Sequence, residues 1–163
     1  MLTSDLLLTH LNYSEGALQR LLEAPSDLQP EELSRDHGTA DKSVLGMLAP
    51  VLAADRHWLA RVRGQEPELF IDESDYSLEV LRREWPAIHQ GWRDWLATLS
   101  MEGIAGPIHY SDLKGRPYAT PAWQIVLHVV NHGTHHRGQI SRFLRRIGQR
   151  PRPLDLIAYY KGL

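Results

Sequence analysis

The chain contains no cysteine among its 163 residues. Disulfide bonds, zinc–thiolate sites and a nucleophilic thiol belonging to the protein itself are therefore excluded. If the protein takes part in sulfur chemistry, the sulfur must come from an external thiol.

Long apolar runs and an excess of charge of one sign are also lacking. No stretch approaches the roughly 18 apolar residues of a membrane span, and the N-terminus, MLTSDLLLTHLNYSEG, has neither a basic leader nor the apolar run of a signal peptide. With 18 Lys+Arg against 20 Asp+Glu, the formal net charge is −2, which gives no overall attraction to nucleic acid or to an anionic membrane. We therefore expect a soluble, cytoplasmic protein with neither of these partners.

Helical periodicity dominates the chain, whose length suits a single domain over residues 1–163. Leucines recur at intervals of three and four residues between positions 4 and 23, as an amphipathic helix requires. Ser43 can cap a second helix that runs to about Val62 with Pro50 in its interior. Ser77 can cap a third helix that runs to about Leu99.

The last third of the chain predicts a hairpin followed by a long helix. Residues 107–119, PIHYSDLKGRPYA, contain a Lys-Gly turn signal and indicate a small hairpin or irregular excursion. Thr120 and Pro121 are typical of a helix start, and this fourth helix should run to about Ile147, before Gly148. Four helices of about twenty residues without internal repeats indicate an all-α four-helix bundle, antiparallel or partly crossed over.

A histidine cluster, NHGTHHRGQ at residues 131–139, lies on the predicted fourth helix. At about 100° per residue, His132 and His136 fall on or beside the apolar stripe that contains Val129. We therefore expect these two imidazoles to face the bundle interior. His135 and Arg137 should point further from the stripe, towards solvent or a neighbouring subunit.

His132 and His136 stand one helical turn apart, so both Nε2 atoms can point at one divalent ion about 2.0–2.2 Å from each. A pair at this spacing is a weak signal alone, and the inward direction strengthens it. Residue 133 is glycine, so the general base of an HExxH zinc protease is absent. His128 and Gln139 could orient an imidazole or a bound water, although Gln139 could equally serve the backbone.

The segments LHVVNHGTHHRGQI (127–140), PLDLIAYY (153–160) and ADRHWLARVRG (54–64) together resemble the DinB superfamily of small four-helix-bundle proteins. The resemblance implies an up-up-down-down bundle, often dimeric, with a metal held between helices by three histidines. Two of these match His132 and His136. Members with assigned activity include metal-dependent transferases and isomerases that use bacillithiol or mycothiol, so the resemblance implies a homodimer, a small-molecule substrate and a low-molecular-weight thiol cosubstrate.

One departure from the family pattern concerns the third metal ligand. The family histidine of the second helix stands seven residues before the position of His57, and this chain has Pro50 there, which offers no coordinating atom. His57 lies within about 20° of the same helix face but roughly 10 Å further along the axis, and it is the candidate that would complete a site with His132 and His136. His10 is a second candidate, and His57 could instead simply hydrogen-bond beside Trp58 at the helix surface.

Two interpretations of function remain open. Nitrogen ligands with open positions suit zinc, nickel, copper or iron, and such an ion would lower the pKa of an external thiol and hold the thiolate beside an electrophile. The first interpretation is therefore a metal-dependent thiol S-transferase of the bacillithiol or mycothiol type. The second is a catalytically silent, stress-associated bundle whose metal site is degenerate because of Pro50.

Two further groups of side chains have simpler explanations. Six arginines between residues 137 and 152 radiate around the helix, so we expect a solvated surface or salt bridges in preference to a nucleic-acid site. The tryptophans are best explained as bundle packing; they are Trp58, Trp85, Trp92, Trp95 and Trp123.

Overall fold

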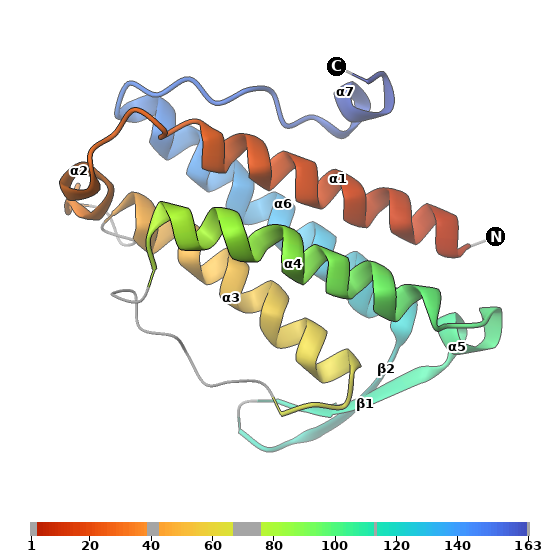
Figure 1. Ribbon diagram of the computed structural model, residues 1–163. Coiled ribbons are helices and arrows are strands. Elements are labelled where there is room, and N and C mark those ends of the chain that lie inside the picture. Colours follow the sequence, from red (N-terminus) through yellow and green to blue (C-terminus); the bar gives the residue numbers. More distant parts are fainter. Residues whose placement is uncertain (1–2, 39–42, 67–75, 113, 163) are drawn as a thin grey trace.

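The computed structural model describes residues 3–38, 43–66, 76–112 and 114–162 (Figure 1). Its four long helices are α1 (Ser4–Glu23), α3 (Val44–Val62), α4 (Leu78–Ala97) and α6 (Ala122–Arg146). The short helices, which the sequence did not predict, are α2 (Pro30–Ser34), α5 (Met101–Ala105) and α7 (Leu156–Tyr160). The strands β1 (Pro107–Ser111) and β2 (Pro117–Pro121) form an antiparallel hairpin. The predicted helical bundle with a hairpin before its last helix is confirmed.

Local capping signals explain where the long helices begin and end. The hydroxyl oxygens of Ser43 and Ser77 accept hydrogen bonds from backbone N–H groups three residues later, at 2.9 and 3.2 Å. The α6 helix begins one residue later than predicted, because its N-cap is Pro121. It ends at Arg146, one residue before the predicted Ile147, and Gly148 follows with a φ of 88°, in the left-handed region that favours glycine.

The α1 and α4 helices run in opposite directions. Arg82, near the start of α4, donates to the carbonyl of Leu22, near the end of α1. Further along α4, Arg93 forms an ion pair with Glu15, which lies nearer the start of α1. Residue numbers therefore rise along one helix while they fall along the other.

The α3 and α4 helices run in the same direction. Arg56 pairs with Glu84 at 2.6 Å. About two turns further along α3, Arg63 donates to the carbonyl of Gly91, which lies further along α4, at 2.9 Å. Trp58 contacts His128, which makes α6 antiparallel to α3 because α6 starts at this end of the bundle (Figure 1). The order of directions is therefore up-down-down-up, and the expected up-up-down-down order is wrong.

The length of one connection explains this order. A helix of 19 residues, the length of α3, spans about 28 Å at about 1.5 Å per residue. The link between Val62 and Leu78 has 15 residues, which at up to about 3.3 Å each is long enough to return along the whole bundle. The chain can therefore start α4 at the same end as α3.

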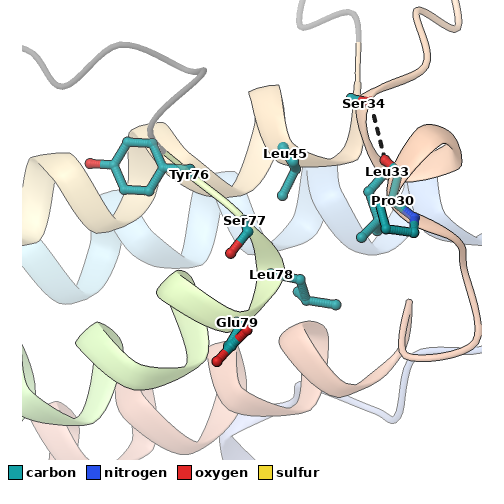
Figure 2. Close-up of a pocket in the computed structure, with 8 residues that line it drawn as sticks. All are labelled: Pro30, Leu33, Ser34, Leu45, Tyr76, Ser77, Leu78 and Glu79. Carbon is teal, nitrogen blue, oxygen red and sulfur yellow. Dashed lines mark hydrogen bonds between the residues drawn. The ribbon is translucent and has the colours of Figure 1, made fainter.

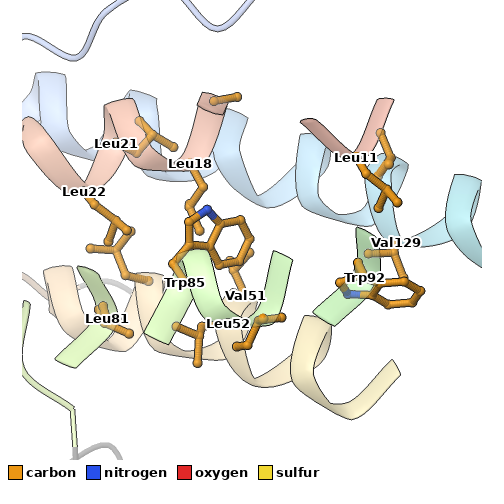
Figure 3. Packing of buried hydrophobic residues seen from close by; sticks show 14 of the residues in the cluster. Leu11, Leu18, Leu21, Leu22, Val51, Leu52, Leu81, Trp85, Trp92 and Val129 are labelled. Atoms are coloured by element: carbon orange, nitrogen blue, oxygen red, sulfur yellow. The ribbon is translucent and has the colours of Figure 1, made fainter. Parts of the chain in front are cut away.

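The four long helices share one apolar core. Figure 3 shows Trp85 and Trp92 among leucines and valines contributed by all four helices. The indole N–H of Trp85 donates to the carbonyl of Glu15 at 3.1 Å, so this large side chain is buried without an unpaired donor. Trp95 is also buried, which confirms packing as the role of these three residues, whereas Trp58 and Trp123 are only half-buried.

The hairpin lies against the end of α3 (Figure 1). Tyr110 pairs with Tyr118 across the two strands, and Gly115 in the turn has a φ of 76°. Tyr110 also contacts Trp58 of α3, with ring centroids 5.2 Å apart. Among the residues described, no helix is long and apolar enough to cross a membrane.

Candidate metal centre

His132 and His136 lie side by side on α6, with their Nε2 atoms 3.1 Å apart and their ring centroids 4.4 Å apart. Both side chains are half-buried. An ion about 2.1 Å from each nitrogen would make an angle of about 95° with the two atoms, which lies within the range of octahedral and tetrahedral sites. The same distance allows a hydrogen bond between two neutral rings. The predicted pair is therefore assembled in a geometry that suits chelation.

The surroundings of His132 favour its neutral form. Burial lowers the pKa of this imidazole below its usual 6.5, and the neighbouring His136 and His128 lower it further. The Asp55 carboxylate acts in the opposite direction and raises the pKa of His132. Because a histidine must be unprotonated at the nitrogen that binds a metal, this environment prepares His132 for that role.

The neighbouring candidates differ in their surroundings. His128 is exposed, and its ring stacks on that of His132 with centroids 5.8 Å apart. His135 is exposed, as predicted, and Gln139 is exposed as well. His128 is thus placed beside the pair, whereas the proposed role of Gln139 stays a prediction.

Among the residues that the structure describes, none joins the pair as a third ligand. His57 is half-buried on α3, where burial and Arg61 lower its pKa. Both ring nitrogens of His10 have other neighbours: its Nδ1 lies 2.8 Å from the carbonyl oxygen of Leu6, and its Nε2 lies 3.5 Å from the Tyr160 hydroxyl. Pro50 is exposed. Within the described ranges, no three His, Asp or Glu side chains are arranged to hold a metal ion.

Arg137 is buried in the bundle interior, although the sequence predicted that it points towards solvent or a neighbouring subunit. Its side chain is only 1% exposed, and its guanidinium donates to the hydroxyls of Ser14 and Thr134, each at 2.8 Å. The guanidinium also lies 5.3 Å from the ring centroid of Tyr13. The expectation that Arg137 points outward is therefore wrong, because α1 supplies both an acceptor and an aromatic ring. His132 and His136 consequently lie at the edge of the buried stripe.

Sequence reasoning also missed a buried acid. Asp55 of α3 is 2% exposed, and its Oδ2 lies 3.4 Å from Nε2 of His89 on α4, which is 1% exposed. The other oxygen, Oδ1, has no hydrogen-bond partner in the described part of the chain. Asp55 lies three residues after Leu52 and four before Leu59, two core positions, and this spacing is the signal that could have predicted its burial.

A separate pocket of about 670 Å³ lies between α2 and the first turns of α3 and α4 (Figure 2). None of the candidate ligands lines it. The lining residues are Pro30, Leu33, Ser34, Leu45, Tyr76, Ser77, Leu78 and Glu79. This pocket therefore does not belong to the histidine site.

Comparison with known proteins agrees with this fold and gives the family of the chain. The model of the DinB family matches residues 1–162. The chain is 24% identical to Protein DinB of Bacillus subtilis (strain 168), an alignment that covers 96% of this chain and 94% of that protein. The crystal structure of a DinB-like protein from Bacillus cereus ATCC 10987 superposes with a TM-score of 0.66 at 19% identity, over 90% of this chain and 94% of that one. The protein therefore belongs to the DinB family.

Proposed function

We propose that this protein binds one divalent metal ion, zinc, nickel or iron, through His132 and His136, and that it is a thiol S-transferase. The observation that carries the proposal is the 3.1 Å separation of the two Nε2 atoms on one half-buried face of α6. The cosubstrate would be a low-molecular-weight thiol of the bacillithiol or mycothiol type. The substrate would be a small electrophile.

The chain's own residues fit a metal of this kind in part. The two imidazoles are held by adjacent turns of one helix, and burial lowers the pKa of His132, which favours its neutral form. Two protein nitrogens leave positions open for an external ligand. A bound ion of this class lowers the pKa of a thiol that reaches it, and the chain, which has no cysteine, would take that thiol from solution.

A second candidate function is a catalytically silent bundle associated with stress. It is favoured by one observation: the position of the family's third histidine is Pro50, and no other side chain in the described ranges joins the pair as a third ligand. In this case His132 and His136 would hydrogen-bond to each other and serve only the fold.

Elemental analysis separates the two functions. Untagged protein is incubated with zinc, nickel or ferrous iron, desalted and analysed for metal. We expect about one retained ion per chain, and its loss in His132→Ala and in His136→Ala. His135→Ala is the matched control, because this neighbouring histidine is exposed and its removal should leave the metal content unchanged. An ion-free wild-type protein would exclude the transferase and favour the silent bundle.

Activity and assembly are then measured on the metal-loaded protein. Loss of free thiol in the presence of an electrophile, absent in His132→Ala, would support the S-transferase assignment. We also propose that the protein is a homodimer, as the family resemblance implies. Light scattering coupled to size exclusion should give twice the chain mass of 18.6 kDa, and a monomer mass would contradict this assembly.

A further inference from the structure

Arg61 on α3 carries a guanidinium whose donors find no acceptor in the parts of the chain that the structure describes. Its Nε atom is buried and has no hydrogen-bond partner there. The other arginines that are buried or half-buried in those parts do have acceptors: Arg20 with Pro153, Arg56 with Glu84, Arg93 with Glu15 and Arg137 with Ser14. Among these described arginines Arg137 also leaves its Nε without a partner, but its two terminal nitrogens donate to Ser14 and Thr134. Arg61 therefore differs from the others in having no acceptor for any of its donors in the described parts of the chain.

The nearby carboxylate of Asp112 accepts hydrogen bonds from groups other than Arg61. Its Oδ1 accepts hydrogen bonds from the backbone N–H groups of Lys114 and Arg116, at 2.8 and 3.0 Å. Its Oδ2 accepts from the Arg116 side chain at 2.7 Å and from the Tyr118 hydroxyl at 3.4 Å. Burial lowers the pKa of Arg61, and Tyr110 and Asp112 only partly oppose this shift. Asp112 thus acts on Arg61 from a distance, without occupying its donors.

Two aromatic rings flank the Arg61 guanidinium. Its central carbon lies 4.7 Å from the ring centroid of Trp58 and 5.4 Å from that of Tyr110. Tyr110 is held in place by a 3.2 Å hydrogen bond between its hydroxyl and that of Thr120, and by stacking on Tyr118. The cation is therefore held against flat, partly apolar surfaces from α3 and the hairpin, with its in-plane donors available.

This cluster is continuous with the histidine pair. Trp58 contacts the ring of His128 with centroids 5.1 Å apart, and His128 stacks on His132 at 5.8 Å. A row of rings thus leads from Arg61 to the candidate metal ligands. A molecule that bound at Arg61 and extended along Trp58 and His128 would reach His132.

We propose that Arg61, Trp58 and Tyr110 bind the carboxylate of a planar organic acid, whose unsaturated or aromatic body lies along Trp58 and His128. A planar guanidinium matches a carboxylate through two parallel hydrogen bonds, and the flat rings match a flat apolar body. The inference names a substrate class for the proposed enzyme: one end of the molecule binds Arg61, and the other end reacts near His132. Only the placing of the reacting end at His132 rests on the proposed function. The binding half of the proposal needs no metal.

The test uses metal-free full-length protein and calorimetric titration with benzoate. Benzamide is the neutral isostere of benzoate, and acetate has the charge without the planar body. We expect benzoate to bind at least about tenfold more tightly than either, because a charge-assisted pair and ring contacts both contribute. This comparison needs no variant, so it holds whether or not a substitution perturbs folding.

Variants then place the binding at Arg61. We expect Arg61→Gln to weaken benzoate binding at least about tenfold, and Arg61→Lys to weaken it less, since lysine keeps the charge but loses the planar fork. Arg145→Gln is the matched control, because Arg145 is an exposed arginine of α6 and its loss should not change binding. Equal affinities for benzoate and benzamide, or unchanged binding in Arg61→Gln, would overturn the proposal.

Metal content separates this inference from the proposed function. Arg61→Gln should retain as much metal as the wild type, since Arg61 is not a ligand. If metal is retained and benzoate shows no preference, the carboxylate site is wrong and the metal site stands. If benzoate binds through Arg61 and no metal is retained, the proposed function fails and the carboxylate site stands.

Discussion

The guanidinium of Arg137 occupies the space beside the α-carbon of Gly133. Its Nη1 lies 2.5 Å from the point where a β-carbon on residue 133 would stand, which is closer than such atoms approach in proteins. The guanidinium cannot simply move away, because it is buried and donates to Ser14 and Thr134. Glycine at position 133 therefore makes room for the buried arginine.

We expect Gly133→Ala to lower the free energy of unfolding by about 1–3 kcal/mol, the usual cost of overpacking a core. Denaturant unfolding followed by circular dichroism measures it. Gly138→Ala on the same helix is the control: nothing lies within 4 Å of its added carbon, so the helix propensity of alanine should make it neutral or stabilising by up to about 1 kcal/mol. Equal stabilities of the two variants would show that Arg137 does not fill this space.

The buried pair of Asp55 and His89 gives a prediction of non-additivity. Replacing His89 alone by leucine leaves the Asp55 carboxylate buried without its neighbour, and we expect a loss of about 3 kcal/mol or more. Replacing both residues by leucine removes the buried charge with its partner, so the double variant should lose much less than the two single variants together. A double-mutant cycle from denaturant unfolding measures this coupling, and additive losses would mean that the two side chains do not interact.

The lowered pKa of His132 predicts a pH dependence of stability in the metal-free protein. As pH falls below 6.5, the unfolded chain takes up a proton at this residue before the folded protein does. The contribution of His132 to stability is therefore complete above pH 6.5 and is lost as pH falls through the lower folded-state pKa. Unfolding free energies at about pH 7.5 and about pH 5.5 should differ less in His132→Asn than in the wild type. A difference in His132→Asn as large as that in the wild type would contradict the burial effect.

Pro50→His tests whether a histidine at the position that the family resemblance implies would strengthen metal binding. The α3 and α6 helices are antiparallel, and Trp58 contacts His128, so a residue eight positions earlier on α3 lies near the level of His136 on α6. An imidazole there would add a third nitrogen, and we expect the dissociation constant for zinc to fall at least about tenfold. Pro50→Ala is the control, because it also removes the proline without adding a donor. If both variants bind zinc equally well, position 50 does not face the site.

The sequence by itself determined those features that depend on neighbours along the chain. Ser43 and Ser77 cap their helices because a hydroxyl reaches N–H groups only three residues away. His132 and His136 meet because α-helix geometry brings residues four apart to one face. The hairpin followed from the turn signal around Gly115 in the same local way.

Only the tertiary structure decided how these elements face one another. The up-down-down-up order, the burial of Arg137 against α1 and the pairing of Asp55 with His89 each depend on contacts between residues at least 28 positions apart. Whether a charged side chain is buried depends on the acceptors and rings that another helix brings to it, and periodicity carries no information about these partners. For the same reason helix geometry alone predicted His57 as a third ligand, whereas in the described part of the chain no group of three potential ligands is assembled.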